Sequence, residues 1–358
     1  MRVGLSMLTL VPGGMGGSEV YARSLCRALA EAGADVVALV PPGAEDAGEG
    51  LRTNVVAEYA PGDSPLGKAR GLASVRLHAT SIRRRYDGID VVHYPFTVPV
   101  PRLPLPSALT LHDLQHRDLP RLFSRGRRGF RRLAYDRAAV AAQAVIVPSQ
   151  FVRERALTLL GLDERRIHVV PHGVDHRLFR PGAEEREPFL LYPARTWPHK
   201  NHATLLEAFA RLRSERPELR LMLTGAGTEA LAGAGVDGRG SVPLPELVSL
   251  YRRAACLVFP SLYEGFGAPP LEAMACGTPV AAARAGSLPE VCGDAAVLFD
   301  PRDADDVARA VLEALERREE LVAAGLERAS AFTWEGSARG HLEAFASAVA
   351  AHRQTVAS

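Results

Sequence analysis

Short apolar segments alternate with longer segments of helical period along this chain, and the alternating pattern occurs twice. In the first half, helical segments at 19–32 and 126–142 accompany strand-like segments at 3–8, 36–40, 89–94, 108–111 and 144–147. In the second half, helical segments at 204–214 and 245–253 accompany strand-like segments at 189–192, 220–223, 256–259, 280–283 and 296–299. Strands that alternate with helices predict parallel sheets with crossover helices. We therefore expect two similar α/β domains.

The segment at 172–187 interrupts the apolar pattern with glycine, proline and a run of charged residues, which is typical of a linker. We expect an N-terminal domain at 1–178, a second domain at 179–336, and a C-terminal helix and tail at 337–358. No strand follows the helices expected at 304–316, 319–332 and 337–352, and the last of them is expected to cross back to the first domain.

The charge of the chain is nearly balanced, with 43 basic and 41 acidic residues and a formal net charge of +2. This balance excludes a protein held to nucleic acid by bulk charge. Residues 1–178 hold 24 basic and 17 acidic residues, net +7, whereas the remainder holds 19 and 24, net −5. The opposite signs indicate different binding partners for the two halves.

The first residues combine one basic residue with a short apolar run, a pattern that a signal peptide shares. Pro12 and two glycines follow in place of a small-residue cleavage site, so we favour a buried first strand. No segment reaches the ~18 apolar residues that a membrane span needs. The four cysteines form no Cys-x-x-Cys pair and indicate neither a zinc site nor a disulfide framework. We expect a cytoplasmic location.

A glycine-rich loop follows the first strand, and a helix is expected to begin near Ser18 as its N-cap. Bare amides at a helix N-terminus favour an anionic ligand. A nicotinamide or flavin fingerprint is disfavoured, because Glu19 occupies the place of the third glycine and prolines follow the second strand. A tight turn without a ligand is the other interpretation.

The most informative segment, 260–280, combines the end of a strand, a glycine loop and a short helix. Glu264 lies in the loop, and Glu272 is expected in the first turn of the helix, which Pro270 begins. Carboxylates accept hydrogen bonds from hydroxyls, and loop amides donate to phosphate oxygens, so the segment suits a polyhydroxylated, phosphorylated ligand. From the residues alone, a dipole-compensating helix residue and a solvated loop acid are an equal alternative.

Arg195 and Lys200 lie five residues apart in a segment that Pro198 keeps from being a helix interior. On a loop, the two cations can converge on one anion, arginine through two N–H groups and lysine as a point charge. A solvated basic loop is the alternative. Lys200 is one of only two lysines in the chain; the other is Lys68.

Taken together, these segments resemble the retaining glycosyltransferases of family 4, which have the GT-B architecture. The segment 264–280 resembles the signature of that family. It reads Glu-Gly-Phe-Gly-x-Pro-x-Leu-Glu-Ala-Met-Ala-x-Gly-x-Pro-Val, in which the two glutamates are Glu264 and Glu272. Further similar segments follow in the family's order at 16–19, 112–114, 170–175, 195–201 and 288–296. The resemblance covers nearly the whole chain and implies two Rossmann-like domains that face each other across a cleft.

The resemblance assigns roles by position. Glu264 would bond the hydroxyls of the donor sugar, Glu272 would bond the ribose, and Arg195 and Lys200 would bind the diphosphate. Charge grows on the leaving diphosphate in the transition state, so cations fixed there accelerate transfer. The other donor contacts would be the backbone of Gly16 and Gly17 at the diphosphate, His112, Gly265, Phe266 and Gly267 at the sugar, and the loop with Val242 and Leu244 at the base.

His112 also has a simpler interpretation as a histidine bonded to nearby backbone. No metal is expected, since no His, Cys and Asp cluster has metal-ligand spacing. Asp303-x-Asp305 resembles the pair of metal-dependent transferases, but its place at a predicted helix start fits capping aspartates better. No cofactor is expected either, because the nucleotide sugar is a substrate.

A basic run at 117–132 carries seven arginines with leucines and phenylalanines between them. A solvated helix and loop face is the simpler interpretation. The alternative is a patch for an anionic acceptor or for a membrane surface, which would place the protein at the inner face of a membrane.

The expected activity is transfer of a hexose-type sugar from a UDP- or GDP-linked donor to an acceptor hydroxyl, with retention of configuration. The acceptor would be a sugar, a lipid-linked molecule or a small molecule, in glycan, glycolipid or natural-product biosynthesis. Two alternatives are a GT-B nucleotide-sugar hydrolase or epimerase, and a non-catalytic module that binds nucleotide sugar.

Overall fold

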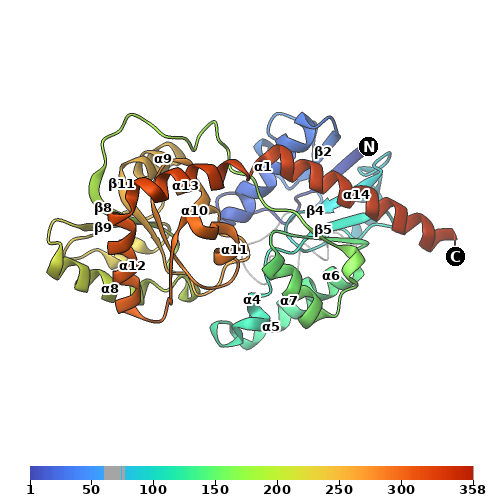
Figure 1. Ribbon diagram of the computed structural model, residues 1–358. Coiled ribbons are helices and arrows are strands. Elements are labelled where there is room, and N and C mark those ends of the chain that lie inside the picture. Colours follow the sequence, from blue (N-terminus) through green and yellow to red (C-terminus); the bar gives the residue numbers. More distant parts are fainter. Residues whose placement is uncertain (60–73, 75–76, 358) are drawn as a thin grey trace. The chain divides into compact units, whose positions relative to one another are not determined.

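A computed structural model describes residues 1–59, 74 and 77–357 of the chain; Lys68 lies outside them. The chain divides into two compact units (Figure 1). Unit 1 is Met1–Gly173 together with Trp334–Ser358, and unit 2 is Val174–Thr333. Across the described ranges, every helix is too short or too polar to cross a bilayer.

Unit 1 is built on a parallel sheet of seven strands in the order β3-β2-β1-β4-β5-β6-β7. The strands are β1 (Arg2–Ser6), β2 (Asp35–Val40), β3 (Thr53–Val55), β4 (Val91–Tyr94), β5 (Ser107–Thr110), β6 (Ala144–Val147) and β7 (Ile167–Val169). In its central register, Gly4 pairs with Val37 on one side and Val92 on the other. Apolar clusters bury the two faces of this sheet, as expected for parallel strands covered by helices.

The helices of unit 1 are α1 (Gly17–Glu31), α3 (Ala79–Arg84), α4 (Gln115–Asp118), α5 (Arg125–Arg131), α6 (Arg137–Ala141), α7 (Gln150–Leu160) and α14 (Trp334–Ala357). A π-helical turn, η3 (Arg132–Asp136), joins α5 to α6, so the single helix expected at 126–142 is irregular. The expected N-cap at Ser18 is wrong. Gly16 precedes the helix with φ 59° and ψ −132°, which glycine adopts readily, and the helix begins before Ser18.

The C-terminal helix α14 packs within unit 1, beside α1 (Figure 1). Ala338, Ala344, Phe345 and Ala348 are buried in the same apolar cluster as residues of α1 and β1. The hydroxyl of Tyr21 on α1 also lies 2.7 Å from Nε2 of His341. The helix therefore completes one face of the unit 1 sheet.

Unit 2 is built on a parallel sheet of six strands in the order β10-β9-β8-β11-β12-β13. The strands are β8 (Glu187–Pro193), β9 (Arg220–Thr224), β10 (Val236–Gly238), β11 (Ala254–Phe259), β12 (Val280–Ala283) and β13 (Val297–Phe299). The chain order reverses where β8 pairs with β11. In doubly wound sheets, ligands bind outside the carboxyl ends of the strands at this reversal.

The helices of unit 2 are α8 (His202–Glu215), α9 (Leu244–Arg253), α10 (Ala268–Ala275), α11 (Leu288–Cys292), α12 (Ala304–Glu316) and α13 (Arg318–Ser330). Helix α10 begins at Ala268, so Pro270 is not its first residue and Glu272 lies beyond its first turn, contrary to the prediction. Two doubly wound sheets nevertheless confirm the expected pair of Rossmann-like domains.

Candidate active site

Lys200 and Glu264 meet at the carboxyl edge of the unit 2 sheet, where β8 and β11 end. Nζ of Lys200 lies 2.6 Å from Oε1 of Glu264, and the two side chains are only 16% and 15% exposed. The ammonium also lies 5.5 Å from the centre of the Phe259 ring. An ammonium has three donors, so Lys200 can hold Glu264 and still donate to a ligand.

Hydrogen bonds join the loops that carry this ion pair. Tyr192, at the end of β8, donates its hydroxyl proton to the carbonyl of Lys200 over 2.7 Å. Nδ2 of Asn201 donates to the carbonyls of Pro260 and Pro301, and the amide of Leu262 donates to the carbonyl of His199. Three segments far apart in the sequence are thereby fixed around Lys200.

The loop of Glu264 is fixed from its other side by Ser287. The Ser287 amide donates to the Glu264 carbonyl over 3.1 Å, and its hydroxyl donates to the Phe266 carbonyl over 2.7 Å. Gly286, with φ 60°, comes so close that an added Cβ would lie 2.6 Å from the Glu264 carbonyl oxygen. Only glycine tolerates both this φ and this approach.

Arg195 lies on the loop after β8, and its guanidinium is 5.6 Å from the ring of Trp197. The loop is held against the end of β9, because an added Cβ on Gly225 would lie 2.7 Å from the Ala194 carbonyl carbon. The Thr196 amide donates to the carbonyl of Ala226 over 3.2 Å. These contacts hold the loop of Arg195 against the end of β9.

Glu272 lies on α10 and accepts a hydrogen bond over 2.7 Å from the hydroxyl of Tyr251 on α9. Burial raises the pKa of Glu272 to about 7, although the Tyr251 hydrogen bond lowers it. Burial and the nearby Glu272 carboxyl raise the pKa of Tyr251 well above its usual value, so the tyrosine remains the donor.

The remaining unit 2 residues of the predicted donor site differ in how deeply they are buried. Phe266 is buried and packs against Phe332, while Gly267 precedes α10 as its N-cap. Val242 is partly buried against the unit 2 core, and Leu244, the first residue of α9, is 47% exposed. An exposed leucine at the start of a helix offers an apolar surface against which a base could pack.

In unit 1, a side chain of α1 binds one amide of the glycine loop. Oε2 of Glu19 accepts the Gly13 amide over 2.8 Å. The amides of Gly16 and Gly17, in contrast, have no hydrogen-bond acceptor among residues 1–59, 74 and 77–357. These two amides at the N-terminus of α1 remain open to an anion.

His112 follows β5 and is partly buried. Its Nε2 lies 2.7 Å from the carbonyl of Pro95, which only accepts, so Nε2 carries the proton and Nδ1 is the lone-pair nitrogen. Burial lowers the pKa of His112, which favours the neutral ring. The backbone-bonded interpretation therefore holds for Nε2, and Nδ1 is the atom that could accept a sugar hydroxyl.

The basic run divides into arginines with structural partners and arginines without them. Arg117 and His116 bind Asp136, and Arg131 binds Asp113. Burial raises the pKa of Asp136, but these hydrogen bonds outweigh it and hold the pKa below its usual value. In the described part of the chain, no side-chain hydrogen bond or ion pair is recorded for Arg121, Arg125, Arg127, Arg128 and Arg132. The Arg127 guanidinium lies 5.7 Å from the centre of the Phe123 ring.

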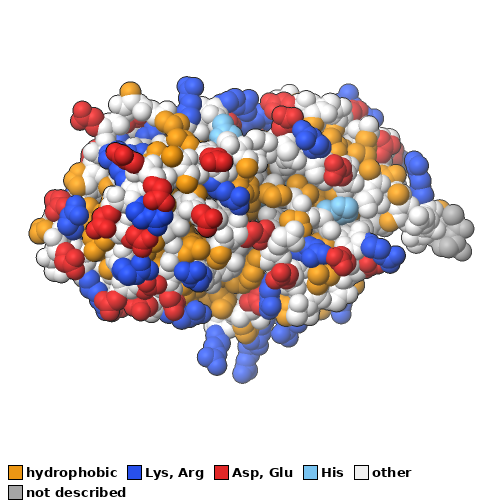
Figure 2. Space-filling model, viewed as in Figure 1, with side chains coloured by type: hydrophobic (Ala, Val, Ile, Leu, Met, Phe, Trp, Pro, Cys, Tyr) orange, Lys and Arg blue, Asp and Glu red, His pale blue; other side chains and the backbone are white. Residues whose placement is uncertain are grey.

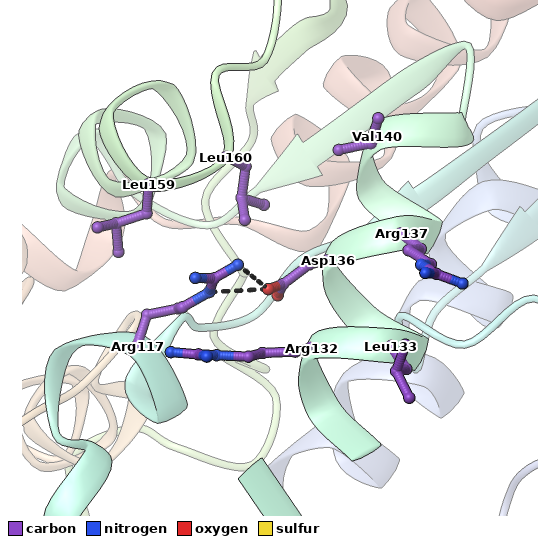
Figure 3. A pocket seen from close by; sticks show the side chains of 8 residues that line it. All are labelled: Arg117, Arg132, Leu133, Asp136, Arg137, Val140, Leu159 and Leu160. Carbon is purple, nitrogen blue, oxygen red and sulfur yellow. Dashed lines mark hydrogen bonds and ion pairs between the residues drawn. The ribbon is translucent and has the colours of Figure 1, made fainter. Parts of the chain in front are cut away.

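A pocket of about 390 Å³ lies beside this run in unit 1 (Figure 3). Arg117 is bound to Asp136, and the Arg132 side chain extends beside it. The pocket is further lined by Leu133, Arg137, Val140, Leu159 and Leu160. The space-filling view shows basic side chains projecting from the end of unit 1 that carries α5 (Figure 2).

The sequence did not single out Tyr251 or Ser287, which hold the two glutamate segments in place. Tyr251 has the spacing of an ordinary core residue of α9, and Ser287 resembles a loop serine. Neither carries a signal that one sequence can provide. Among the residues that the structure describes, no group of three or more His, Cys, Asp and Glu side chains is arranged as metal ligands.

Two family models together match most of the chain. The family described as "Glycosyltransferase Family 4" matches residues 15–178, and "Glycosyl transferases group 1" matches 175–328. An O-antigen chain mannosyltransferase B of Escherichia coli is 31% identical over 262 residues, which cover 66% of this chain and 69% of that protein. The alignments with two further relatives, a mannosyltransferase of Mycolicibacterium hassiacum and a D-inositol 3-phosphate glycosyltransferase of Geodermatophilus obscurus, span about half of the length of those proteins.

Two solved structures share the fold over nearly the whole chain. Sucrose-phosphate synthase from Thermosynechococcus elongatus superposes with a TM-score of 0.80 at 24% identity, and covers 100% of both chains. The Anabaena protein HepE in complex with UDP-glucose superposes with a TM-score of 0.72 at 17% identity, covering 96% of this chain and 98% of its own. The chain therefore has the GT-B fold and belongs to the glycosyltransferases of family 4.

Proposed function

We propose that this glycosyltransferase moves a hexose-type sugar from UDP or GDP to an acceptor hydroxyl, with retention of configuration. The observation that carries the proposal is the Lys200–Glu264 ion pair, fixed at the sheet edge where β8 and β11 end. A cation for phosphate and a carboxylate for hydroxyls stand side by side there, which matches the two halves of a sugar nucleotide. The UDP-glucose bound to the HepE fold supports this class of donor.

In the proposed reaction, the bond between the anomeric carbon and the diphosphate oxygen breaks, and the acceptor oxygen forms a new bond to that carbon on the same face. The acceptor proton passes to the leaving diphosphate oxygen. Lys200 and Arg195 stabilise the charge that grows on the diphosphate, since preorganised cations act without reorganisation cost. Glu264 orients Lys200 and accepts hydrogen bonds from the sugar.

We also propose that the amides of Gly16 and Gly17 bind oxygens of the donor diphosphate. Their lack of other acceptors and their position at the start of the fifteen-residue helix α1 support this role. It also makes His112 a neutral acceptor for a donor-sugar hydroxyl through Nδ1, because Nε2 already donates to Pro95. No metal ion is assigned to the reaction.

For the acceptor side, we propose that the arginines of the 117–132 run without partners contact an anionic membrane surface near a lipid-linked acceptor. Phe130 and Leu133 support this contact, because they lie next to these arginines in the sequence and are 49% and 57% exposed to solvent. Apolar side chains interleaved with cations suit the boundary between head groups and acyl chains. The neighbouring pocket offers Arg132 and Arg137 to a phosphate and leucines to the adjoining chain.

The donor is identified by thermal-shift measurements with UDP-, GDP- and dTDP-sugars, since a ligand that binds the folded state raises Tm. We expect one base to stabilise the chain. Incubation of the protein with the stabilising donor, without acceptor, then separates the alternatives. A hydrolase would release free sugar, an epimerase would convert the donor to a different nucleotide sugar, and a transferase should leave the donor largely unchanged. Absence of any shift with all three donor classes would contradict the proposal.

The membrane contact is tested by sedimentation with vesicles of phosphatidylglycerol and phosphatidylcholine. A variant with Arg121, Arg125 and Arg128 changed to glutamine should lose binding to the anionic vesicles. Arg309→Gln, on the exposed face of α12, is the matched control. Equal binding of the triple variant and the original chain would contradict this part of the proposal.

A further inference from the structure

The hydroxyl of Tyr251 is the only polar group of the described residues that holds the Glu272 side chain. It donates to Oε2 over 2.7 Å from the neighbouring helix α9. Oε1 accepts no hydrogen bond from residues 1–59, 74 and 77–357. One carboxylate oxygen is therefore fixed by the protein, and the other remains available for a ligand.

The surrounding residues define the position of Tyr251. It is fully buried, and the edge of its ring packs against Phe179 with the centroids 5.9 Å apart. Its backbone carbonyl accepts a hydrogen bond from the Thr278 hydroxyl, which lies just after α10. Helix α9 and the end of α10 thus define the position of the hydroxyl, and the hydroxyl defines the position of the carboxylate.

We propose that Tyr251 is a positioning residue for the donor nucleotide: its hydroxyl holds Oε2 of Glu272 so that Oε1 faces the ribose. The inference rests on the proposed function, in which Glu272 accepts ribose hydroxyls. A tyrosine that acts through another residue in this way changes nucleotide affinity without touching the nucleotide.

The same hydrogen bond favours the ionised form of Glu272, which is the stronger acceptor for ribose hydroxyls. Burial raises the pKa of Glu272 to about 7, and the Tyr251 hydrogen bond opposes that rise. The other titratable group that interacts with Glu272 is the thiol of Cys276, the C-cap of α10, whose own pKa burial raises to about 12, so it stays neutral. No charged side chain from α9, α11 or α13, within the described part of the chain, contributes to the pKa of Glu272.

The consequence is a pH dependence of nucleotide affinity with a defined sign. Affinity is highest above the pKa of Glu272 and weakens as pH falls through it, because the protonated carboxyl is a poorer acceptor for ribose hydroxyls. Removing the tyrosine hydroxyl raises that pKa, so the midpoint of the loss moves to higher pH. A tyrosine with a purely structural role would lower Tm and leave the midpoint unchanged.

The test compares the original chain with Tyr251→Phe by isothermal titration of UDP and GDP from about pH 6 to about pH 9, a range that brackets the Glu272 pKa. Near pH 7, Tyr251→Phe should bind each nucleotide about tenfold more weakly than the original chain, the usual cost of a lost hydrogen bond to a charged group. The midpoint of its pH-dependent loss of affinity should lie at higher pH than that of the original chain. Inorganic diphosphate, which lacks ribose, should bind both chains equally. Tyr86→Phe removes a buried hydroxyl bonded to Ser6 in unit 1 and serves as the control.

Each outcome is informative. Unchanged UDP and GDP affinity in Tyr251→Phe at every pH would overturn the inference while leaving the proposed function intact. Equal weakening of nucleotide and inorganic diphosphate would also overturn it, since a general distortion and not the ribose contact would be lost. If the original chain binds neither UDP nor GDP, the proposed function fails, and this inference fails with it.

Discussion

Lys200→Met tests the role of the ammonium with little change in shape. Methionine keeps an unbranched stem beside Phe259 and removes the charge that lies 2.6 Å from Glu264. Loss of one preorganised donor from a transition state typically lowers kcat by about a hundred- to a thousandfold. Because both side chains are mostly buried, loss of the ion pair should also destabilise unit 2, by about 1–3 kcal/mol, below the cost for a fully buried pair.

The assay measures kcat and KM for transfer with the donor identified by thermal shift, alongside urea unfolding. The matched control is Arg309→Met, which removes a cation from two exposed ion pairs on α12 and should leave kcat within about twofold. The double variant Lys200→Met with Glu264→Gln should lose less than the sum of the single losses, because the two side chains act as a unit. A folded Lys200→Met variant that retains kcat within about threefold refutes the reasoning.

Three further predictions concern the support of the site and the fold. Gly286→Ala should displace the Glu264 backbone, lowering kcat at least about tenfold and stability by about 1–3 kcal/mol in a transfer assay and urea unfolding, and an unchanged kcat would contradict the close packing. In the original chain, the free energy of unfolding should fall as pH rises from about 4.5 to about 7, because Glu272 is still protonated in the folded state and already ionised in the unfolded state. Glu272→Gln should abolish this fall in a urea-unfolding series. The variant should therefore be more stable than the original chain at pH 8 and equal to it below about pH 4. Phe345→Ala on α14 should cost about 3–5 kcal/mol in unfolding of unit 1, whereas the exposed Phe130→Ala should change it by less than about 0.5 kcal/mol, and similar values for both would contradict the burial of α14 in unit 1.

The parallel sheets were predictable because strands buried on both faces give continuous apolar runs. The strands that the sequence did not predict, β3, β7 and β10, all lie at sheet edges, and each has three residues. These three strands include polar residues such as Asn54, His168 and Asp237, so they lack an apolar run, whereas the edge strand β13 is apolar and was predicted. The π-helical turn at Arg132–Asp136 was equally hidden, since it changes the backbone without changing residue composition.

The residues proposed for the donor site came from the family resemblance of their motifs, which does not identify their partners. Lys200 and Glu264 are 64 positions apart, and only the neighbouring ends of β8 and β11 bring them together. Tyr251 lies 21 positions before Glu272 on another helix, so its contact depends on how α9 packs beside α10. Long-range side-chain contacts of this kind depend on packing and leave no pattern in one sequence. The near absence of lysine, however, makes Lys200 distinctive in the sequence itself.

The most direct test of the account is a crystal structure of the chain with the nucleotide sugar that gives the largest thermal shift. The account predicts diphosphate oxygens within hydrogen-bond distance of Lys200 and Arg195, sugar hydroxyls at Glu264, and ribose hydroxyls at Oε1 of Glu272 with the Tyr251 bond preserved. A nucleotide bound away from the edge where β8 and β11 end, or a ribose that does not contact Glu272, would contradict it.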